Sequence, residues 1–340
     1  MPAAKPCRLS VRGEVYMAVV EEHQDLHVDG LVVARTPLRL AAERLRHDYV
    51  ALGSVLFIAL LVLFALAGTV FESWTGHPLN RSNASGVDDY TLLPVGPMVG
   101  CPDGLASVGE KHCFVLGASN SLGYDMLVQL SFGARTSLII GVVATLLTVV
   151  AALLLGVVAG YVGGWTDTAI ARLMDVVAAF PFLLFAVAAS VAFGPSLWFV
   201  IIIIAFFSWF YPGRIFRGEV LALRDREFVT AARMLGASNT RIVLRHLMPQ
   251  LIGPITVYTS LSIAGAIAAE AALSYLGFGL PLEIPSWGRM ISDAVPGGLY
   301  INAPFLMIFP GTLLILTVLA FNLLGDGLRD ALDPRGGTQL

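Results

Sequence analysis

Six long stretches of this chain consist almost entirely of apolar residues, and they limit the possible fold more than any other feature. A helix needs about 20 mostly apolar residues to cross a bilayer core. Only 13 % of the 340 residues are charged, against about 25 % in ordinary soluble proteins. The sequence therefore predicts an all-α integral membrane protein with six transmembrane helices. The predicted spans cover residues 50–71, 136–160, 173–193, 196–213, 251–275 and 304–325.

The positions of the basic residues predict the orientation. Lys and Arg concentrate in the cytoplasmic loops of membrane proteins. With both termini in the cytoplasm, seven basic residues precede the first span, one lies between the second and third, seven lie between the fourth and fifth, and two follow the sixth. That arrangement places 17 of the 21 basic residues inside. We therefore expect cytoplasmic N- and C-termini.

The spans divide the chain into four parts. We expect a cytoplasmic tail (1–48), a first transmembrane helix (49–71), an extracytoplasmic loop (72–134) and a core domain (135–335) with five spans and a cytoplasmic loop at 214–249. Acidic residues interrupt the first 34 residues, so we expect no signal peptide there.

Three cysteines are present, Cys7, Cys101 and Cys113. Cys101 and Cys113 fall in the extracytoplasmic loop, where oxidation to a disulfide is favoured; two free thiols in that loop are the alternative. The pattern contains no C-x-x-C pair, so no metal site is expected. The net charge of −3 argues against a nucleic-acid partner. Neither H-E-x-x-H nor G-x-S-x-G occurs, so no catalytic residues are expected.

The segment 224–249, called the elbow below, is the most informative part of the sequence. Residues 224–235 are rich in helix formers, Gly236 permits a sharp turn, and Ser238 or Asn239 can cap a second helix. Pro249 marks the end of that helix and the start of the fifth span. Small side chains on one face allow another surface to approach closely. A short helix, a turn and a second short helix are therefore expected to protrude into the cytoplasm and dock on a soluble partner. The predicted docking residues are Glu227, Ala231, Ala232, Leu235, Gly236, Ala237 and Ser238.

An acidic residue lies inside the fifth span. Glu270 belongs to a polar or small set that recurs every four residues: Tyr258, Ser262, Ala266, Glu270 and Ser274. An ionisable group in a membrane must face protein or water. One interpretation is a pathway-lining face, with Glu270 at an outer gate or meeting a cation. The alternative is a helix-packing face with Glu270 capping a nearby backbone turn.

Three further features have structural interpretations. Gly156, Gly160 and Gly164 form a repeated G-x-x-x-G, which favours close helix packing. Arg172 and Asp175 are spaced to pair on one helix face. Pro181 is expected to kink the third span.

The elbow resembles a known motif. Its spacing, Ala-Ala-x-x-x-Gly followed after nine residues by His-x-Met-Pro, is similar to the EAA loop of permease subunits in bacterial ABC importers. The resemblance is closest to the second permease of the paired dipeptide, oligopeptide and nickel importer subunits. Similar motifs occur in the same order at residues 122–125, 131–138, 160–167, 274–279, 285–288 and 322–335.

The sequence departs from the family pattern at several positions. Thr230 stands where Glu is frequent, and His246 stands in a motif that usually reads Ile-x-Leu-Pro. In the outer motif, Tyr124 replaces an Arg and Asn120 replaces an Asp.

The resemblance implies a type I ABC importer-like fold and a permease function in the bacterial inner membrane. It implies as partners a second permease, two ATPase subunits and an extracytoplasmic solute-binding protein. ATP and Mg would be bound by those ATPase subunits, because this chain has no phosphate-binding loop, and the permease itself would be no enzyme. Peptides are the leading substrate class, with nickel or another small solute as the alternative. A different class, an ATP-independent transporter or channel using Glu270, would be expected to show inverted repeats.

Overall fold

The computed structural model describes residues 47–101, 108–109 and 113–332. Within these ranges the chain is helical and has no β-strand, only isolated bridges. Cys7 and the tail up to residue 46 lie outside the described residues. Four helices are long and apolar enough to cross a membrane, and two bent helix pairs meet the same test when each pair is taken as one span. The order of the main helices is α3 (Tyr49–Leu66), α4 (Gly68–Thr75), α5 (Met126–Val162), α6 (Gly164–Ala179), α7 (Phe182–Phe193), α8 (Leu197–Ser208), α9 (Phe210–Arg224), α10 (Glu227–Met234), α11 (Asn239–Ile242), α12 (Ile252–Tyr275), α13 (Trp287–Asp293), α14 (Leu299–Asn302) and α15 (Phe305–Leu332).

The first span begins at a capped helix end. The carboxylate of Asp48 accepts hydrogen bonds from Val50 N (2.9 Å) and Ala51 N (3.1 Å), which satisfies backbone donors that the helix leaves free. The predicted single helix to residue 71 is divided in the structure, because α3 ends at Leu66 and α4 follows it from Gly68.

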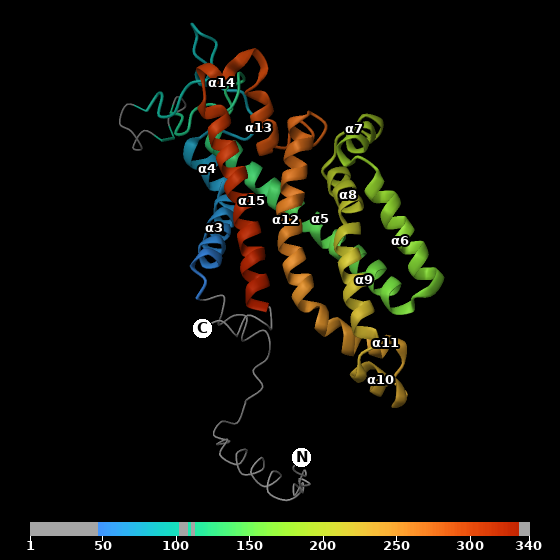
Figure 1. Cartoon of the computed structure of the whole chain (residues 1–340). Helices are drawn as coiled ribbons and strands as arrows, with labels where there is room; N and C mark the ends of the chain where they lie inside the picture. Colours follow the sequence, from blue (N-terminus) through green and yellow to red (C-terminus); the bar gives the residue numbers. More distant parts are fainter. Residues whose placement is uncertain (1–46, 102–107, 110–112, 333–340) are drawn as a thin grey trace, which may run out of the picture.

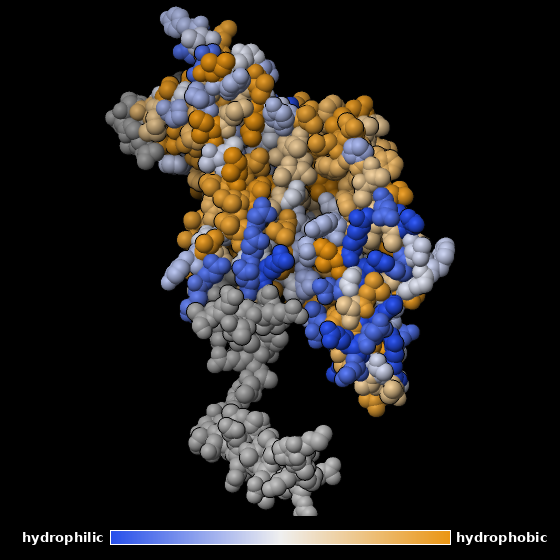
Figure 2. Space-filling view, in the orientation of Figure 1, coloured by the Kyte–Doolittle hydropathy of each residue, from blue (hydrophilic) through white to orange (hydrophobic). Residues whose placement is uncertain are grey.

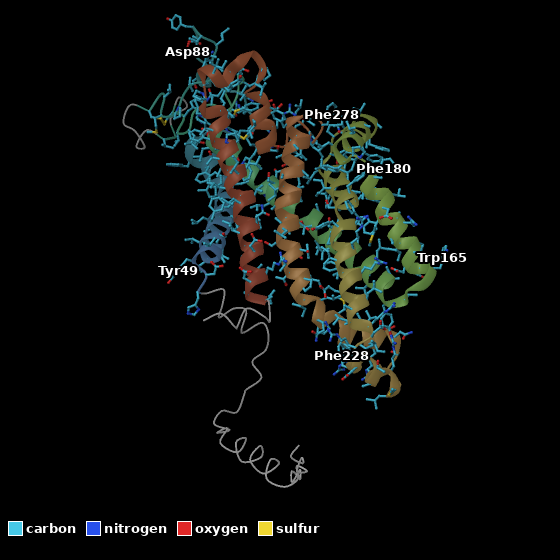
Figure 3. The ribbon with its side chains drawn as sticks, in the orientation of Figure 1. Tyr49, Asp88, Trp165, Phe180, Phe228 and Phe278 are labelled. Carbon is cyan, nitrogen blue, oxygen red and sulfur yellow. A yellow bond between two sulfur atoms is a disulfide. The ribbon has the colours of Figure 1, made fainter. Side chains whose placement is uncertain are left out.

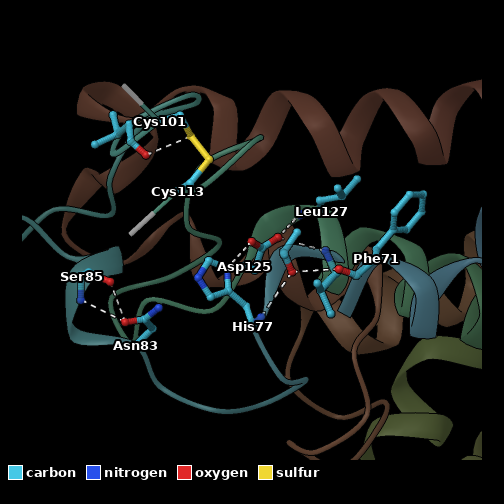
Figure 4. Close-up of polar contacts among 11 residues, drawn as sticks. Phe71, His77, Asn83, Ser85, Cys101, Cys113, Asp125 and Leu127 are labelled. Carbon is cyan, nitrogen blue, oxygen red and sulfur yellow. Dashed lines mark hydrogen bonds and ion pairs between the residues drawn. A yellow bond between two sulfur atoms is a disulfide. The ribbon is translucent and has the colours of Figure 1, made fainter. Parts of the chain in front are cut away.

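The outer segment between α4 and α5 is held by one disulfide and one buried polar pair (Figure 4). Cys101 and Cys113 are joined by a disulfide. His77 Nδ1 lies 2.7 Å from Asp125 Oδ2, with both side chains buried, and the His77 ring stacks on Phe114. Asp125 also caps α5 by accepting from Leu127 N and Val128 N, so the outer segment is fastened to the start of that helix.

Helix α5 is longer than the sequence predicts. It begins at Met126 rather than near residue 136, so the predicted extracytoplasmic loop ends about ten residues early. The added turns contain polar side chains such as Gln129 and Ser131 that are buried against other elements. Their polarity hid them from a prediction based on apolar runs.

The third and fourth spans are each bent. Around Pro181, α6 and α7 meet at 79°, which is a break and not the predicted kink, since the helix stops at Ala179 and restarts at Phe182. Helices α8 and α9 meet at 41°. Helix α9 continues to Arg224, so residues 214–224 extend this helix and are not part of the predicted loop.

The last helices return the chain to its starting end. A Cβ on Gly327 of α15 would lie 2.6 Å from the Cβ of Ala51, so the end of α15 packs on the start of α3. Figure 1 shows α10 and α11 at this end of the molecule, with α13 and α14 at the opposite end. Apolar residues cover the middle, and hydrophilic residues gather at the end that carries the elbow (Figure 2).

The largest buried cluster lies between α5, α8, α9 and α12. It includes Ile140, Ile201, Ile204, Phe216 and Leu273. In this packing α5 contacts α8, α9 and α12, and α12 also contacts α8.

Candidate functional site

The elbow forms the predicted helix, turn and second helix. Helix α10 ends in a Schellman motif, in which Gly236 N donates to Arg233 O and Ala237 N donates to Ala232 O, each at 3.0 Å. Gly236 has a φ of +77°, a conformation that favours glycine at this position. The turn therefore depends on the Gly236 backbone.

The second arm of the elbow continues into α12. Ser238 caps α11 by accepting from Arg241 N at 3.4 Å, and the path from Asn239 to Tyr275 is one helical segment of 37 residues. Pro249 lies inside a 3₁₀ turn, Met248–Leu251, so the predicted helix end at Pro249 is wrong. Proline is tolerated there because it sits near the start of that turn.

A small apolar core fixes the elbow to the membrane helices. Val229 and Ile242 are fully buried, as are Leu247 and Leu251, and they pack with Val157 of α5 and Val220 of α9. Fully burying such side chains contributes about 1.5–3 kcal/mol each. The elbow is thus part of the folded body and not a separate loop.

Polar contacts add to this attachment. The Tyr161 hydroxyl on α5 donates to Asn239 Oδ1 at 2.8 Å, and the Arg233 guanidinium lies 5.7 Å from the Tyr161 ring centre. Arg224 Nη1 donates to the carbonyl of Gly160 at 3.0 Å. These residues join both arms of the elbow to the inner end of α5.

Close packing connects α5 to α9. A Cβ at Gly156 would lie 2.6 Å from Gly213 O, and one at Gly160 would lie 2.8 Å from Arg217 O. The prediction of close packing is confirmed for these two glycines. It is wrong for Gly164, where an added Cβ would meet no atom within 4 Å.

Two ion pairs join α6 to α9. Arg217 forms a bidentate pair with Asp167, with Nη2 to Oδ2 at 2.7 Å. Arg214 pairs with Asp175 at 2.7 Å, closer than the predicted partner Arg172 at 3.9 Å. Bidentate arginine–carboxylate pairs are directional, so they help keep α6, α9 and the elbow in one arrangement.

The elbow exposes large apolar side chains among its polar residues. Met234 is 83 % exposed and Leu235 is 88 % exposed, and Figure 3 places Phe228 here, at the end of the molecule opposite Asp88. Beside them lies a groove of about 380 Å³. Its lining residues are Ala232, Leu235, Gly236, Ala237, Arg241, Arg245 and His246.

The predicted docking residues divide between this surface and the interior. Glu227, Ala231, Leu235, Gly236 and Ser238 are exposed, and Ala237 is half-buried. Ala232 is only 8 % exposed and packs within the apolar core of the elbow, so most of its small side chain serves the chain's own packing.

The sequence did not predict the part that some residues play at the elbow. Tyr161 lies 78 positions from Asn239, so no local pattern connects the two residues. Arg241 and Arg245 are two of the seven basic residues between the predicted fourth and fifth spans, and both line the groove.

We predict that Tyr161→Phe loosens the elbow. The change removes the hydroxyl bond to Asn239 and keeps the ring beneath Arg233. A lost hydrogen bond of about 1 kcal/mol corresponds to about fivefold faster amide hydrogen exchange in α10 and α11. Tyr275→Phe, which removes an exposed hydroxyl at the far end of α12, is the matched control. Equal rates of amide hydrogen exchange in the wild type and both variants would contradict a stabilising role for the Tyr161–Asn239 hydrogen bond.

The predicted pathway residues do not share one environment. Glu270 is fully buried; Ser137 Oγ donates to its Oε2 at 3.2 Å and Ser274 Oγ to its Oε1 at 2.7 Å. Ser286 provides a third hydroxyl contact. Glu270 and Ser274 thus lie in the interior between α5, α12 and the start of α13. The contacts of the Glu270 carboxylate are with serine hydroxyls and not with the backbone turn that the helix-packing interpretation expected.

The inner half of the same stripe is more open. Tyr258 and Ser262 are half-buried. The Tyr258 ring contacts Tyr211 and Phe216 and borders a pocket of about 310 Å³ that also includes Glu219 and Arg329. Of the four predicted pathway residues, Tyr258 reaches this pocket.

Comparison with known proteins gives a consistent result. The model of the family described as "binding-protein-dependent transport system inner membrane component" matches residues 152–336. The chain is 32 % identical to an oligopeptide transport system permease protein of Haemophilus influenzae, over 93 % of each chain. It is 38 % identical to a glutathione transport system permease protein of Escherichia coli, covering 88 % of this chain and 91 % of the relative.

The fold is also similar to a solved structure. Inward-facing conformations of the MetNI methionine ABC transporter include a chain that aligns with a TM-score of 0.51 at 17 % identity, covering 61 % of this chain and 98 % of that chain. At this identity the likeness concerns the fold alone.

Proposed function

Because the chain belongs to the family of inner membrane components of binding-protein-dependent transport systems, we propose that it is the permease subunit of an ATP-driven peptide importer. Members of this family are permease subunits in the inner membrane and are not themselves enzymes. The peptide class rests on the relatives, whose names specify oligopeptides, dipeptides and glutathione.

The proposed topology has six spans with both termini in the cytoplasm. The bent pairs α6–α7 and α8–α9 each count as one span. The start of α3 and the end of α15 pack together, which requires both to be on the same side. The elbow lies at this end too (Figure 1), and the basic residues concentrate there, as expected for the cytoplasmic side.

The proposed mechanism assigns the elbow to ATPase docking. The observation that carries it is an open apolar surface at Met234 and Leu235, beside the Gly236 turn and continuous with α12. An ATPase subunit would hold this surface, and ATP and Mg would be bound there and not in this chain. Closure of two ATPase subunits would move the elbow, and the elbow would move α9 and α12 with it. A second permease would complete the pathway, and an extracytoplasmic binding protein would deliver the solute.

The test is reconstitution of the whole assembly. The chain is co-expressed with a second permease, the ATPases and a binding protein from the same source and placed in vesicles. We expect the ATPase to co-purify and a labelled tripeptide to enter the vesicles only with ATP and binding protein. Uptake that persists without ATP would favour an ATP-independent transporter, and uptake of Ni²⁺ in place of peptide would correct the substrate class.

A further inference from the structure

A second polar pocket lies on the outer face, far from the elbow. It has a volume of about 360 Å³, within the range of small-molecule sites, and lies between residues 120–124 and the α13–α14 region. Figure 1 shows α13 and α14 at the end opposite α10 and α11. The pocket therefore opens on the side from which an importer receives its solute.

One wall carries an arginine and an aspartate that form only a long ion pair. Arg289 and Asp293 lie one turn apart on α13, with Nε and Oδ1 4.0 Å apart and both side chains half-buried. Within the described residues neither side chain has another ion pair or hydrogen bond. Burial raises the pKa of Asp293 above its usual value, and Arg289 opposes that rise only in part. A partly desolvated carboxylate with so distant a partner retains the capacity to accept hydrogen bonds from a cation.

The opposite wall presents a neutral donor in a fixed position. Asn120 Oδ1 accepts from Leu122 N at 3.0 Å and from Tyr124 N at 3.4 Å. The carbonyl side of the amide therefore faces its own loop, and the NH₂ group remains as a donor.

The remaining walls are apolar. Leu122, Leu282 and Leu299 complete the lining. The pocket thus combines a carboxylate, amide and guanidinium donors, and an apolar surface, all within a volume that admits about one or two amino-acid residues.

We propose that this pocket receives the amino terminus of an incoming peptide, with Asp293 binding the ammonium group. Arg289 or Asn120 donates to the first peptide carbonyl, and the leucine side chains contact the first side chain. Each group of the pocket then has a complement in the free end of a peptide. This inference rests on the proposed function, because it takes peptides as the solute.

The arrangement makes a free amino group the feature that is recognised. Acetylation removes the ammonium charge and would leave Asp293 without its cation. A peptide amide at the carboxyl end leaves the recognised groups unchanged. The pocket therefore discriminates between the two ends of a peptide.

The experiment measures binding of trialanine to the assembled permease–ATPase complex in lipid nanodiscs, without binding protein, by saturation-transfer NMR. We expect saturable binding of trialanine and of its carboxyl-terminal amide, and at least tenfold weaker binding of N-acetyl-trialanine. Asp293→Asn should weaken trialanine binding at least tenfold and reduce the preference over the acetylated peptide. Glu283→Gln removes the same charge from an exposed position outside the pocket and should change nothing.

Two results would overturn the inference: equal binding of free and acetylated trialanine to the wild-type complex, or unchanged binding in Asp293→Asn. The first comparison needs no variant, so it remains decisive if Asp293→Asn fails to assemble. ATP-driven uptake is measured on the same preparation with binding protein added. If ATP-driven uptake occurs but the complex binds free and acetylated trialanine equally, the pocket is refuted and the proposed function stands. If no ATP-driven peptide uptake occurs, the proposed function is refuted.

Discussion

Replacing Gly236 with aspartate should reduce ATP-driven uptake about 100-fold, equivalent to about 2.7 kcal/mol of lost docking energy. The turn needs a positive φ, and aspartate tolerates that conformation better than most residues. Among the described residues, no atom lies within 4 Å of a Cβ added at Gly236, so the side chain has room and the cost to the fold is the backbone strain alone. The added side chain would instead project from the groove wall and separate the elbow from a closely packed partner.

Three measurements make this prediction specific. Co-purification of the ATPase should fall, while the amount of chain in the membrane and its melting temperature should stay near wild type. Gly236→Asn should act in the same way, which separates bulk from charge. Gly218→Asp is the matched control, since Gly218 is an exposed helical glycine on α9 with no neighbour within 4 Å and lies outside the groove. Normal uptake and ATPase association in Gly236→Asp would refute docking at this surface.

Gly288→Ala should destabilise the chain by about 3 kcal/mol or more, at the upper end of overpacking effects. A Cβ at Gly288 would lie 2.2 Å from the carbonyl oxygen of Ala271 and 2.7 Å from its Cα. Both are backbone atoms of α12, so no side-chain rotation can relieve the clash. Helix α13 would have to move off α12, disturbing Ser286 beside Glu270.

The expected readout is a lower melting temperature and earlier aggregation in detergent. Gly311→Ala in α15 is the matched control, because a Cβ there meets nothing within 4 Å. It should be neutral or stabilising by up to about 1 kcal/mol, the difference in helix propensity. Equal melting temperatures for the two variants would show that the close contact between Gly288 and Ala271 does not limit the side chain at position 288.

Apolar runs predict helix ends well where apolar and small residues continue to those ends. The fifth span was expected at 251–275 and is observed at Ile252–Tyr275, because apolar and small residues make up most of its length. The start of α5 was missed because Gln129 and Ser131 are polar yet buried by neighbouring elements. The breaks after Ala179 and Ser208 each have a proline close by, Pro181 and Pro212. Pro212 has no N–H to bond the Ser208 carbonyl, but the size of each bend depends on how the helices pack.

The elbow was more predictable than the pathway because its signals are local. Gly236 and Ser238 act on their own turn, so their roles could be inferred from their neighbours. The stripe from Tyr258 to Ser274 could not, because a spacing of four residues advances by about 40° per step on an α-helix. Over the sixteen residues concerned, the stripe rotates from the half-open face at Tyr258 to the buried face at Ser274.

Helix α12, joined to the second arm of the elbow, would act as a lever. Its 24 residues, Ile252–Tyr275, span about 36 Å at 1.5 Å per residue, and the arm reaches it through a π-turn and a 3₁₀ turn. A rotation of α12 by about 10° around its midpoint would displace each end by about 3 Å in opposite directions. A push on the elbow end of α12 would therefore shift Tyr275 by a similar distance, with no need for a relay of side chains between the two ends.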